Sequence, residues 1–114
     1  MAGASSKSAA VNGAHSYDYG NVHVDEDGHV VTVDGEEVLL TRKEFRLLCD
    51  LLRNQGRVLT RDQIMEQVWG FDYGGATRTV DIHINTLRKK IHDDGTMIQT
   101  VRGIGYKIDK EAKE

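Results

Sequence analysis

Two helix-capping boxes in this sequence fix where two of its helices begin. They are Thr41-Arg42-Lys43-Glu44 and Thr60-Arg61-Asp62-Gln63, and in each the threonine and the acid or amide three residues later satisfy exposed backbone amides. A leucine precedes each threonine, and an apolar residue, Phe45 or Ile64, stands where it completes a hydrophobic staple. A helix is therefore predicted to start at each box.

The apolar residues that follow the first box have helical spacing. Phe45, Leu48, Cys49 and Leu52 recur at i, i+3, i+4 and i+7, and this stripe ends near residues 54–56, where a glycine can cap the helix. Cys49 is the only cysteine, so a disulfide framework is excluded and a reduced, buried thiol is expected.

Two further helices are predicted after the second box. The first is short: Ile64 and Val68 mark its buried side, and it ends at Gly70 before a glycine-rich loop at 71–76. The other runs from Thr77, as its N-cap, until residues 93–95 break it. Its expected core positions are Val80, Ile84, Leu87 and Ile91.

Short β-rich runs flank the helices and indicate an α+β fold. The expected strands are 21–24, 29–33, 36–40, 97–101 and 106–108, with a weaker one at 17–19. Asp-Gly pairs separate the first three, which predicts an antiparallel meander, and Gly103 and Gly105 permit a tight turn between the last two. We expect one domain at 17–110, with 1–16 a flexible leader or expression remnant and 111–114 a tail.

The composition and motifs of the chain narrow the classes of function that it can have. The chain lacks an apolar run long enough to span a membrane and an export signal, so the cytoplasm is the expected compartment. The five histidines have no metal-ligand spacing and no nucleophile or phosphate-loop motif occurs, which predicts neither an enzyme nor a metal or cofactor. The net charge is −3, but the charges are unevenly distributed. Residues 77–107 hold six basic residues and three acidic ones, whereas residues 21–55 hold eight acidic residues and four basic ones.

The third predicted helix has one face suited to reading DNA. With the apolar positions turned to the core, the outward stripe is Arg78, Ile82, Asn85, Thr86 and Lys89. Such side chains match guanine, adenine and thymine edges in a major groove, and His83, Arg88 and Lys90 lie on the flanks, near phosphates. The alternative is a solvated face, but Ile82 in a polar stripe favours a partner.

The terminal hairpin offers a second contact. Arg102 stands at a glycine-flanked turn, from which its guanidinium can project into a minor groove, although a turn arginine in water is the alternative. Polar groups of Thr100, Tyr106 and Trp69 are candidates for phosphate contacts, while the rings of Trp69 and Tyr106 are expected in the core. The acidic first half leaves a protein partner open as the rival function.

Four motifs carry a family resemblance across residues 22–108. They are Leu39 to Leu48, then Leu59 to Ile64 with Val68-Trp69-Gly70, then Arg78 to Ile84 with Leu87 to Ile91, and finally Thr100 to Tyr106. The chain resembles the C-terminal effector domain of OmpR/PhoB-type response regulators of bacterial two-component systems. This resemblance implies a winged helix-turn-helix fold with an N-terminal four-stranded antiparallel sheet, a three-helix core and a C-terminal β-hairpin wing.

The resemblance also implies a function. Such a domain binds double-stranded DNA sequence-specifically to control transcription, as tandem copies on direct repeats. The loop between its second and third helices, here Phe71, Asp72, Tyr73, Gly74 and Gly75, can contact RNA polymerase. A receiver domain, absent from this chain, and a sensor kinase are implied as partners. Many relatives have basic residues where this chain has Asn85 and Thr86, so its target DNA sequence is not expected to match the target sequences of those relatives.

Overall fold

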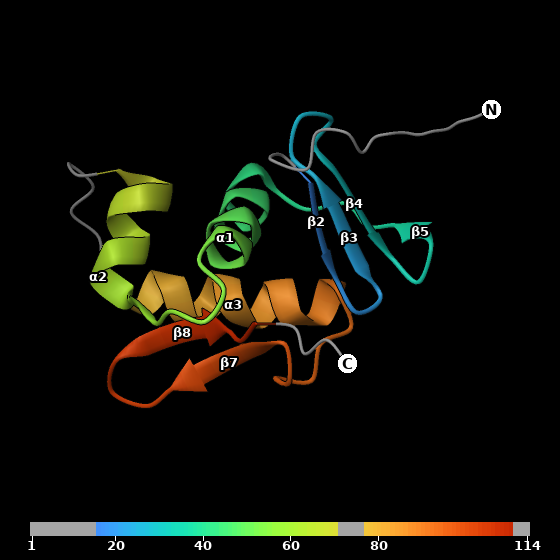
Figure 1. Cartoon of the computed structure of the whole chain (residues 1–114). Coiled ribbons are helices and arrows are strands. Elements are labelled where there is room, and N and C mark those ends of the chain that lie inside the picture. The colour runs from blue at the N-terminus through green and yellow to red at the C-terminus, as the bar shows by residue number, and fades with distance from the viewer. Residues whose placement is uncertain (1–15, 71–76, 111–114) are drawn as a thin grey trace. The chain divides into compact units, whose positions relative to one another are not determined.

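The computed structural model describes residues 16–70 and 77–110 (Figure 1). These residues belong to two compact units that divide after Val38. The predicted leader and tail lie outside the described residues, except Ser16, which already belongs to a strand. In the described part, no helix is long and apolar enough to cross a membrane.

The first unit is a four-stranded antiparallel meander, as predicted (Figure 1). Its strands are β2 (Ser16–Tyr19), β3 (Val22–Asp25), β4 (Val30–Val33) and β5 (Glu36–Glu37). The weak pattern at 17–19 is a true strand, whereas the last strand is much shorter than the expected 36–40. Alternate valines of β3 and β4 are buried, and this period of two assigns one face of the sheet to the interior.

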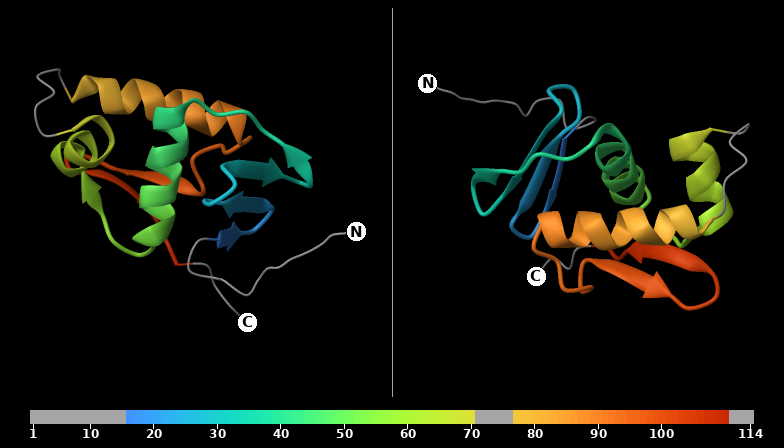
Figure 2. Two further views of the ribbon diagram at one scale, coloured as in Figure 1. Left: turned by 90° about the horizontal axis from the view of Figure 1, so that it is seen from above. Right: turned by 180° about the vertical axis from the view of Figure 1, so that it is seen from behind.

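The second unit contains the helices and a small sheet. Its elements are α1 (Arg42–Arg53), β6 (Leu59–Thr60), α2 (Arg61–Ile64), η2 (Met65–Trp69), α3 (Arg78–Lys90), β7 (Ile98–Val101) and β8 (Gly105–Ile108). Figure 2 shows α1 crossing α3 and the β7–β8 hairpin lying along α3. The three helical segments and the hairpin therefore occur in the predicted order.

Both predicted capping boxes are confirmed. The Thr41 hydroxyl accepts from the Glu44 amide at 3.2 Å and the Glu44 carboxylate accepts from the Thr41 amide at 2.9 Å. Thr60 and Gln63 repeat the arrangement at 3.0 and 2.9 Å. The third cap is wrong: Thr77 precedes α3, but its backbone is already helical and its side chain makes no capping bond.

The second helix departs from a regular α-helix. After Ile64 it widens into the π-helical turn η2, and the Gly70 amide donates to the Met65 carbonyl at 3.0 Å. Because a π-turn holds more residues than an α-turn, the buried stripe shifts along the sequence. Met65 is therefore buried, whereas Val68, predicted on the buried side, is only half-buried.

The core of the second unit follows the predicted stripes. Val80, Ile84, Leu87 and Ile91 are at most 2% exposed, and all four apolar positions predicted in α1 are buried. One of them is Cys49, with 1% of its surface exposed. α1 also buries residues beyond that stripe, among them Leu47, Leu51 and Asp50.

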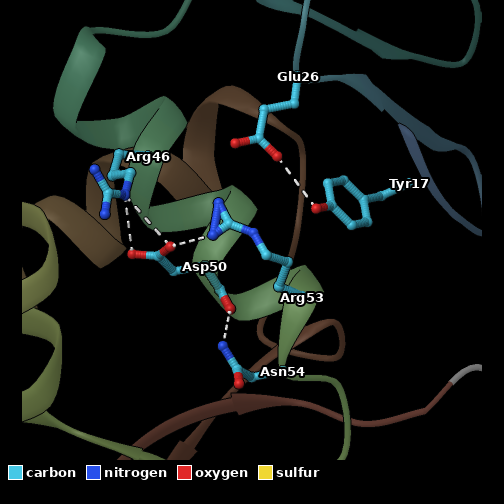
Figure 3. A network of polar contacts seen from close by, with 6 residues as sticks. All are labelled: Tyr17, Glu26, Arg46, Asp50, Arg53 and Asn54. Atoms are coloured by element: carbon cyan, nitrogen blue, oxygen red, sulfur yellow. Dashed lines mark hydrogen bonds and ion pairs between the residues drawn. The ribbon is translucent and has the colours of Figure 1, made fainter. Parts of the chain in front are cut away.

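Buried and half-buried polar groups form hydrogen bonds with neighbours within each unit. In α1, the Asp50 carboxylate accepts from Arg46 at 3.4 Å and from Arg53 at 3.1 Å (Figure 3). In the first sheet, the Tyr17 hydroxyl donates to Glu26 at 3.2 Å, as the same figure shows. Such pairing offsets the cost of removing these groups from water.

The two glycines of the terminal hairpin serve different purposes. Gly103 has a φ of +75°, so it forms the tight turn, as predicted. Gly105 lies instead where β8 pairs with β6, a strand that the sequence did not predict, and a Cβ there would stand 1.9 Å from the Leu59 carbonyl oxygen. Gly105 is therefore required by the close approach of two strands, in a sheet ordered β6-β8-β7.

Candidate nucleic-acid interface

The predicted reading stripe of α3 points outward. Arg78, Ile82, Asn85 and Lys89 are exposed, and Ile82 leaves 57% of its surface in solvent. Thr86 is half-buried, and its hydroxyl donates to the Ile82 carbonyl at 3.1 Å. Because the hydroxyl hydrogen of Thr86 is used in this bond, Thr86 can contact a partner through its methyl group or accept a hydrogen bond through its oxygen. The amphipathic division of α3 is thus the predicted one.

One flank of α3 forms an aromatic cluster with two other elements. The rings of His83 and Trp69 meet edge to face, with their centroids 4.8 Å apart. A ring nitrogen of His83 lies 3.0 Å from the Thr79 carbonyl, and the Lys43 ammonium of α1 lies 5.6 Å from the centroid of a Trp69 ring. Packing therefore fixes the orientation of both predicted phosphate contacts, His83 and Trp69, and Lys43 adds a cation beside them.

Lys90, a predicted phosphate contact, turns to the protein instead. Its ammonium donates to the Glu44 carboxylate at 2.8 Å, and Glu44 is only 3% exposed. Burial raises the pKa of Glu44, but the Lys90 and Thr41 hydrogen bonds lower it by more, so the net pKa lies below its ordinary value. Lys90 is thus committed to compensating a buried charge that also caps α1.

Arg88, also predicted on the phosphate side, bridges the helix to the hairpin. Its Nε donates to the Ile98 carbonyl at 3.0 Å, and its Nη2 donates to the same carbonyl and to the Thr100 hydroxyl, the latter at 2.9 Å. These bonds leave Thr100 exposed and keep Arg88 half-buried. Arg88 therefore has a positional role that its sequence position did not reveal.

The ring of Tyr106 is buried, as predicted, but its hydroxyl donates to an acceptor within the protein and not to solvent. It donates to Asp81 of α3, which also accepts from Arg61 at 2.9 Å. Burial raises the pKa of Asp81, yet the bonds from Tyr106 and Arg61 outweigh this and lower its net pKa. Burial, together with the bond to Asp81, raises the pKa of Tyr106. The hydroxyl therefore stays protonated and bound to Asp81.

The wing presents Arg102 to solvent. Arg102, Gly103 and Ile104 are exposed, and Ile104 has 50% of its surface in solvent. Among the residues that the structure describes, Arg78, Lys89 and Arg102 have no carboxylate within ion-pair distance. These three cations, two on α3 and one on the wing, are available to a polyanion.

The loop residues predicted to contact RNA polymerase, Phe71, Asp72, Tyr73, Gly74 and Gly75, lie outside the described residues. Within the described part, sequence reasoning missed the roles of Lys43, Arg61 and Asp81. The sequence holds one signal for the role of Asp81, since it is an acidic residue in the first turn of an otherwise basic helix.

Comparisons with known proteins agree with this architecture. A family model described as "Transcriptional regulatory protein, C terminal" matches residues 35–108. The sensory transduction protein RegX3 of Mycolicibacterium smegmatis is 50% identical over 93 residues, which is 79% of this chain and 41% of that protein. Transcriptional regulatory protein CseB of Streptomyces coelicolor is 47% identical over 90 residues, 79% of this chain and 38% of that protein. The chain thus spans less than half the length of these relatives.

Solved structures give the same fold. The DNA-binding domain of Klebsiella pneumoniae RstA, crystallised in complex with the RstA box, superposes with a TM-score of 0.74 at 33% identity, over 82% of this chain and 96% of that one. Response regulator DrrB of Thermotoga maritima, an OmpR/PhoB homologue, gives 0.76 at 35% identity, over 83% and 44%. The predicted winged helix-turn-helix fold is confirmed, with its sheet, helices and hairpin.

Proposed function

Because the chain belongs to the family of C-terminal domains of transcriptional regulatory proteins, we propose that it binds double-stranded DNA sequence-specifically, with α3 in the major groove and Arg102 in the minor groove. Membership of this family also confirms the resemblance to OmpR/PhoB-type response regulators. The proposed activity is regulatory binding, without catalysis and in the cytoplasm.

The observation that carries this proposal is the exposed stripe of α3. Arg78 and Lys89 are cations without an ion-pair partner in the described part of the chain, and Asn85 and Ile82 between them offer an amide and an apolar contact. Exposed guanidinium, amide and aliphatic groups along one helix are the chemistry that distinguishes base pairs in a major groove. The DNA-binding domain of the relative RstA was crystallised in complex with the RstA box, which supports DNA binding by this fold.

The backbone contacts are proposed in two groups. Thr100 is exposed and Trp69 and His83 are half-buried, and these three are the favoured phosphate contacts. Arg88, Lys90 and Tyr106 are bound internally, so any contribution they make to a phosphate has to be shared with those partners.

For a longer protein that contains this domain, we propose the partners that the resemblance to OmpR/PhoB-type response regulators implies. Tandem copies would occupy direct repeats, and the loop at 71–75 would contact RNA polymerase. A receiver domain and a sensor kinase complete the pathway. Pairing two effector domains through receivers raises their effective concentration on adjacent half-sites, which is how phosphorylation would act on DNA binding.

The test is selection of duplexes from a random pool on the purified chain. Enrichment of a defined sequence is expected, followed by sequence-specific retardation in a gel that weakens as salt is added. Failure to retain any duplex at low salt would overturn the proposal and favour a protein partner.

A further inference from the structure

Asp81 joins three elements of the second unit at one carboxylate. It lies in the first turn of α3, accepts from Arg61 of α2 at 2.9 Å and accepts from the Tyr106 hydroxyl of β8. Its side chain is 38% exposed, so the carboxylate is at the protein surface, and both donors bind the same oxygen, Oδ1. A carboxylate held by two donors from different elements restrains all three of them.

A second polar link holds the same hairpin two helical turns further along α3. Arg88 follows Asp81 by seven residues, about 10 Å along the helix axis, and donates to Ile98 and Thr100 of β7. The guanidinium carbons of Arg61 and Arg88 lie 5.4 and 5.7 Å from the centroid of the Tyr106 ring. The hairpin is thus attached to α3 at both ends of the reading stripe.

We propose that Asp81 is a positioning residue that holds the wing relative to α3, so that Arg102 and the outward stripe enter adjacent grooves together. This inference rests on the proposed DNA binding. A wing fixed before binding loses little conformational freedom on the duplex, whereas an unrestrained wing must be ordered at the expense of affinity. Asp81 therefore contributes to specific binding through Arg102, without contacting DNA itself.

A purely electrostatic role of Asp81 and a positioning role predict opposite changes in DNA affinity when the carboxylate is removed. Asp81→Ala changes the net charge from −3 to −2 and releases Arg61, so electrostatics alone predicts tighter binding to every duplex. Positioning predicts weaker binding to the selected duplex and unchanged or tighter binding to random DNA. Asp62→Ala, at an exposed position of α2, makes the same change in charge and is the matched control.

The experiment measures fluorescence anisotropy of the full 114-residue chain with the selected duplex and with a random duplex. Asp81→Ala should lose roughly 10-fold in affinity for the selected duplex only, comparable to loss of one base contact. Asp81→Asn, which keeps an acceptor oxygen for Tyr106, should recover part of this loss although its charge equals that of Asp81→Ala. Asp62→Ala should leave the ratio of the two affinities unchanged.

A double-mutant cycle separates positioning from a general effect on folding. Arg102→Ala should weaken specific binding roughly 10-fold in the unaltered chain but less than about 3-fold in the Asp81→Ala background, because an unheld arginine contributes less. Tyr106→Phe, which removes only the hydroxyl, serves as the second variant if Asp81→Ala unfolds. Additive losses, or an unchanged affinity ratio in these variants, overturn the inference. Absence of binding by the unaltered chain overturns the proposed function with it.

Discussion

Among the glycines that the structure describes, Gly105 is the one where adding a single methyl group should have the largest effect. A Cβ there would stand 1.9 Å from the Leu59 carbonyl oxygen and 2.9 Å from both the Leu59 carbonyl carbon and the Thr60 Cα. These are backbone atoms, so no side-chain rotation relieves the overlap. The strands must separate by at least about 1.1 Å to restore the 3.0 Å that real Cβ atoms keep.

The magnitude follows from what this separation breaks. β6 pairs with β8 through only two residue pairs, Leu59 with Tyr106 and Thr60 with Gly105. Losing the short ladder costs about 1 kcal/mol for each hydrogen bond, and the overpacking adds about 1–3 kcal/mol. With two such bonds, Gly105→Ala should therefore reduce the free energy of unfolding by about 3–5 kcal/mol, which lowers Tm by roughly 12–40 °C in a domain of this size.

The matched control is Gly103→Ala in the same hairpin. Gly103 has a φ of +75°, and a methyl carbon added to it would have no heavy atom within 4 Å, so only backbone strain of about 1 kcal/mol is expected. Urea denaturation followed by circular dichroism measures both variants. If Gly105→Ala were no less stable than Gly103→Ala, the argument from close strand approach would be refuted.

Four further results are expected. Arg78→Ala should cost about 1–3 kcal/mol on the selected duplex and little on random DNA; equal losses on both would remove it from the base contacts. Arg88→Lys should bind the selected duplex as weakly as Arg88→Ala, because the bonds to the hairpin need a guanidinium, and rescue by lysine would instead indicate a phosphate contact. Lys90→Met should destabilise the fold by about 2 kcal/mol, because the buried Glu44 carboxylate loses its cation and keeps the bond from the Thr41 amide; an unchanged urea midpoint would contradict this. Folding lowers the pKa values of Glu44 and Asp81, so these carboxylates stabilise the fold fully at a pH above their ordinary pKa values of 4.5 and 3.8. This stabilisation is lost as the pH falls through the lowered pKa values; a free energy of unfolding that rises on acidification would oppose this assignment.

The parts of the fold that follow local rules were predictable. Thr41 and Thr60 cap helices because the partners of each capping box lie three residues away, and the stripe that includes Ile84 and Leu87 follows from helical periodicity alone. Thr77 fails because its own backbone is already helical, and the Val80 amide donates to the Thr77 carbonyl instead of to its hydroxyl.

The rest depends on partners distant in sequence. The direction of Lys90 is set by Glu44, 46 residues away, and that of the Tyr106 hydroxyl by Asp81, 25 residues away. Neither pair can be read from periodicity, which gives a residue's face and not its partner. The strand β6 was missed for the same reason, since Leu59 and the capping residue Thr60 carry no β pattern until β8 lies beside them.

The burial of Cys49 makes the chain convenient to label. With one cysteine in the sequence and only 1% of it exposed, a thiol-reactive dye meets little competition from the native residue. A cysteine introduced at the exposed Ile104 would therefore take a fluorophore selectively, without prior removal of Cys49. Fluorescence from that site then follows the approach of the wing to a duplex in real time.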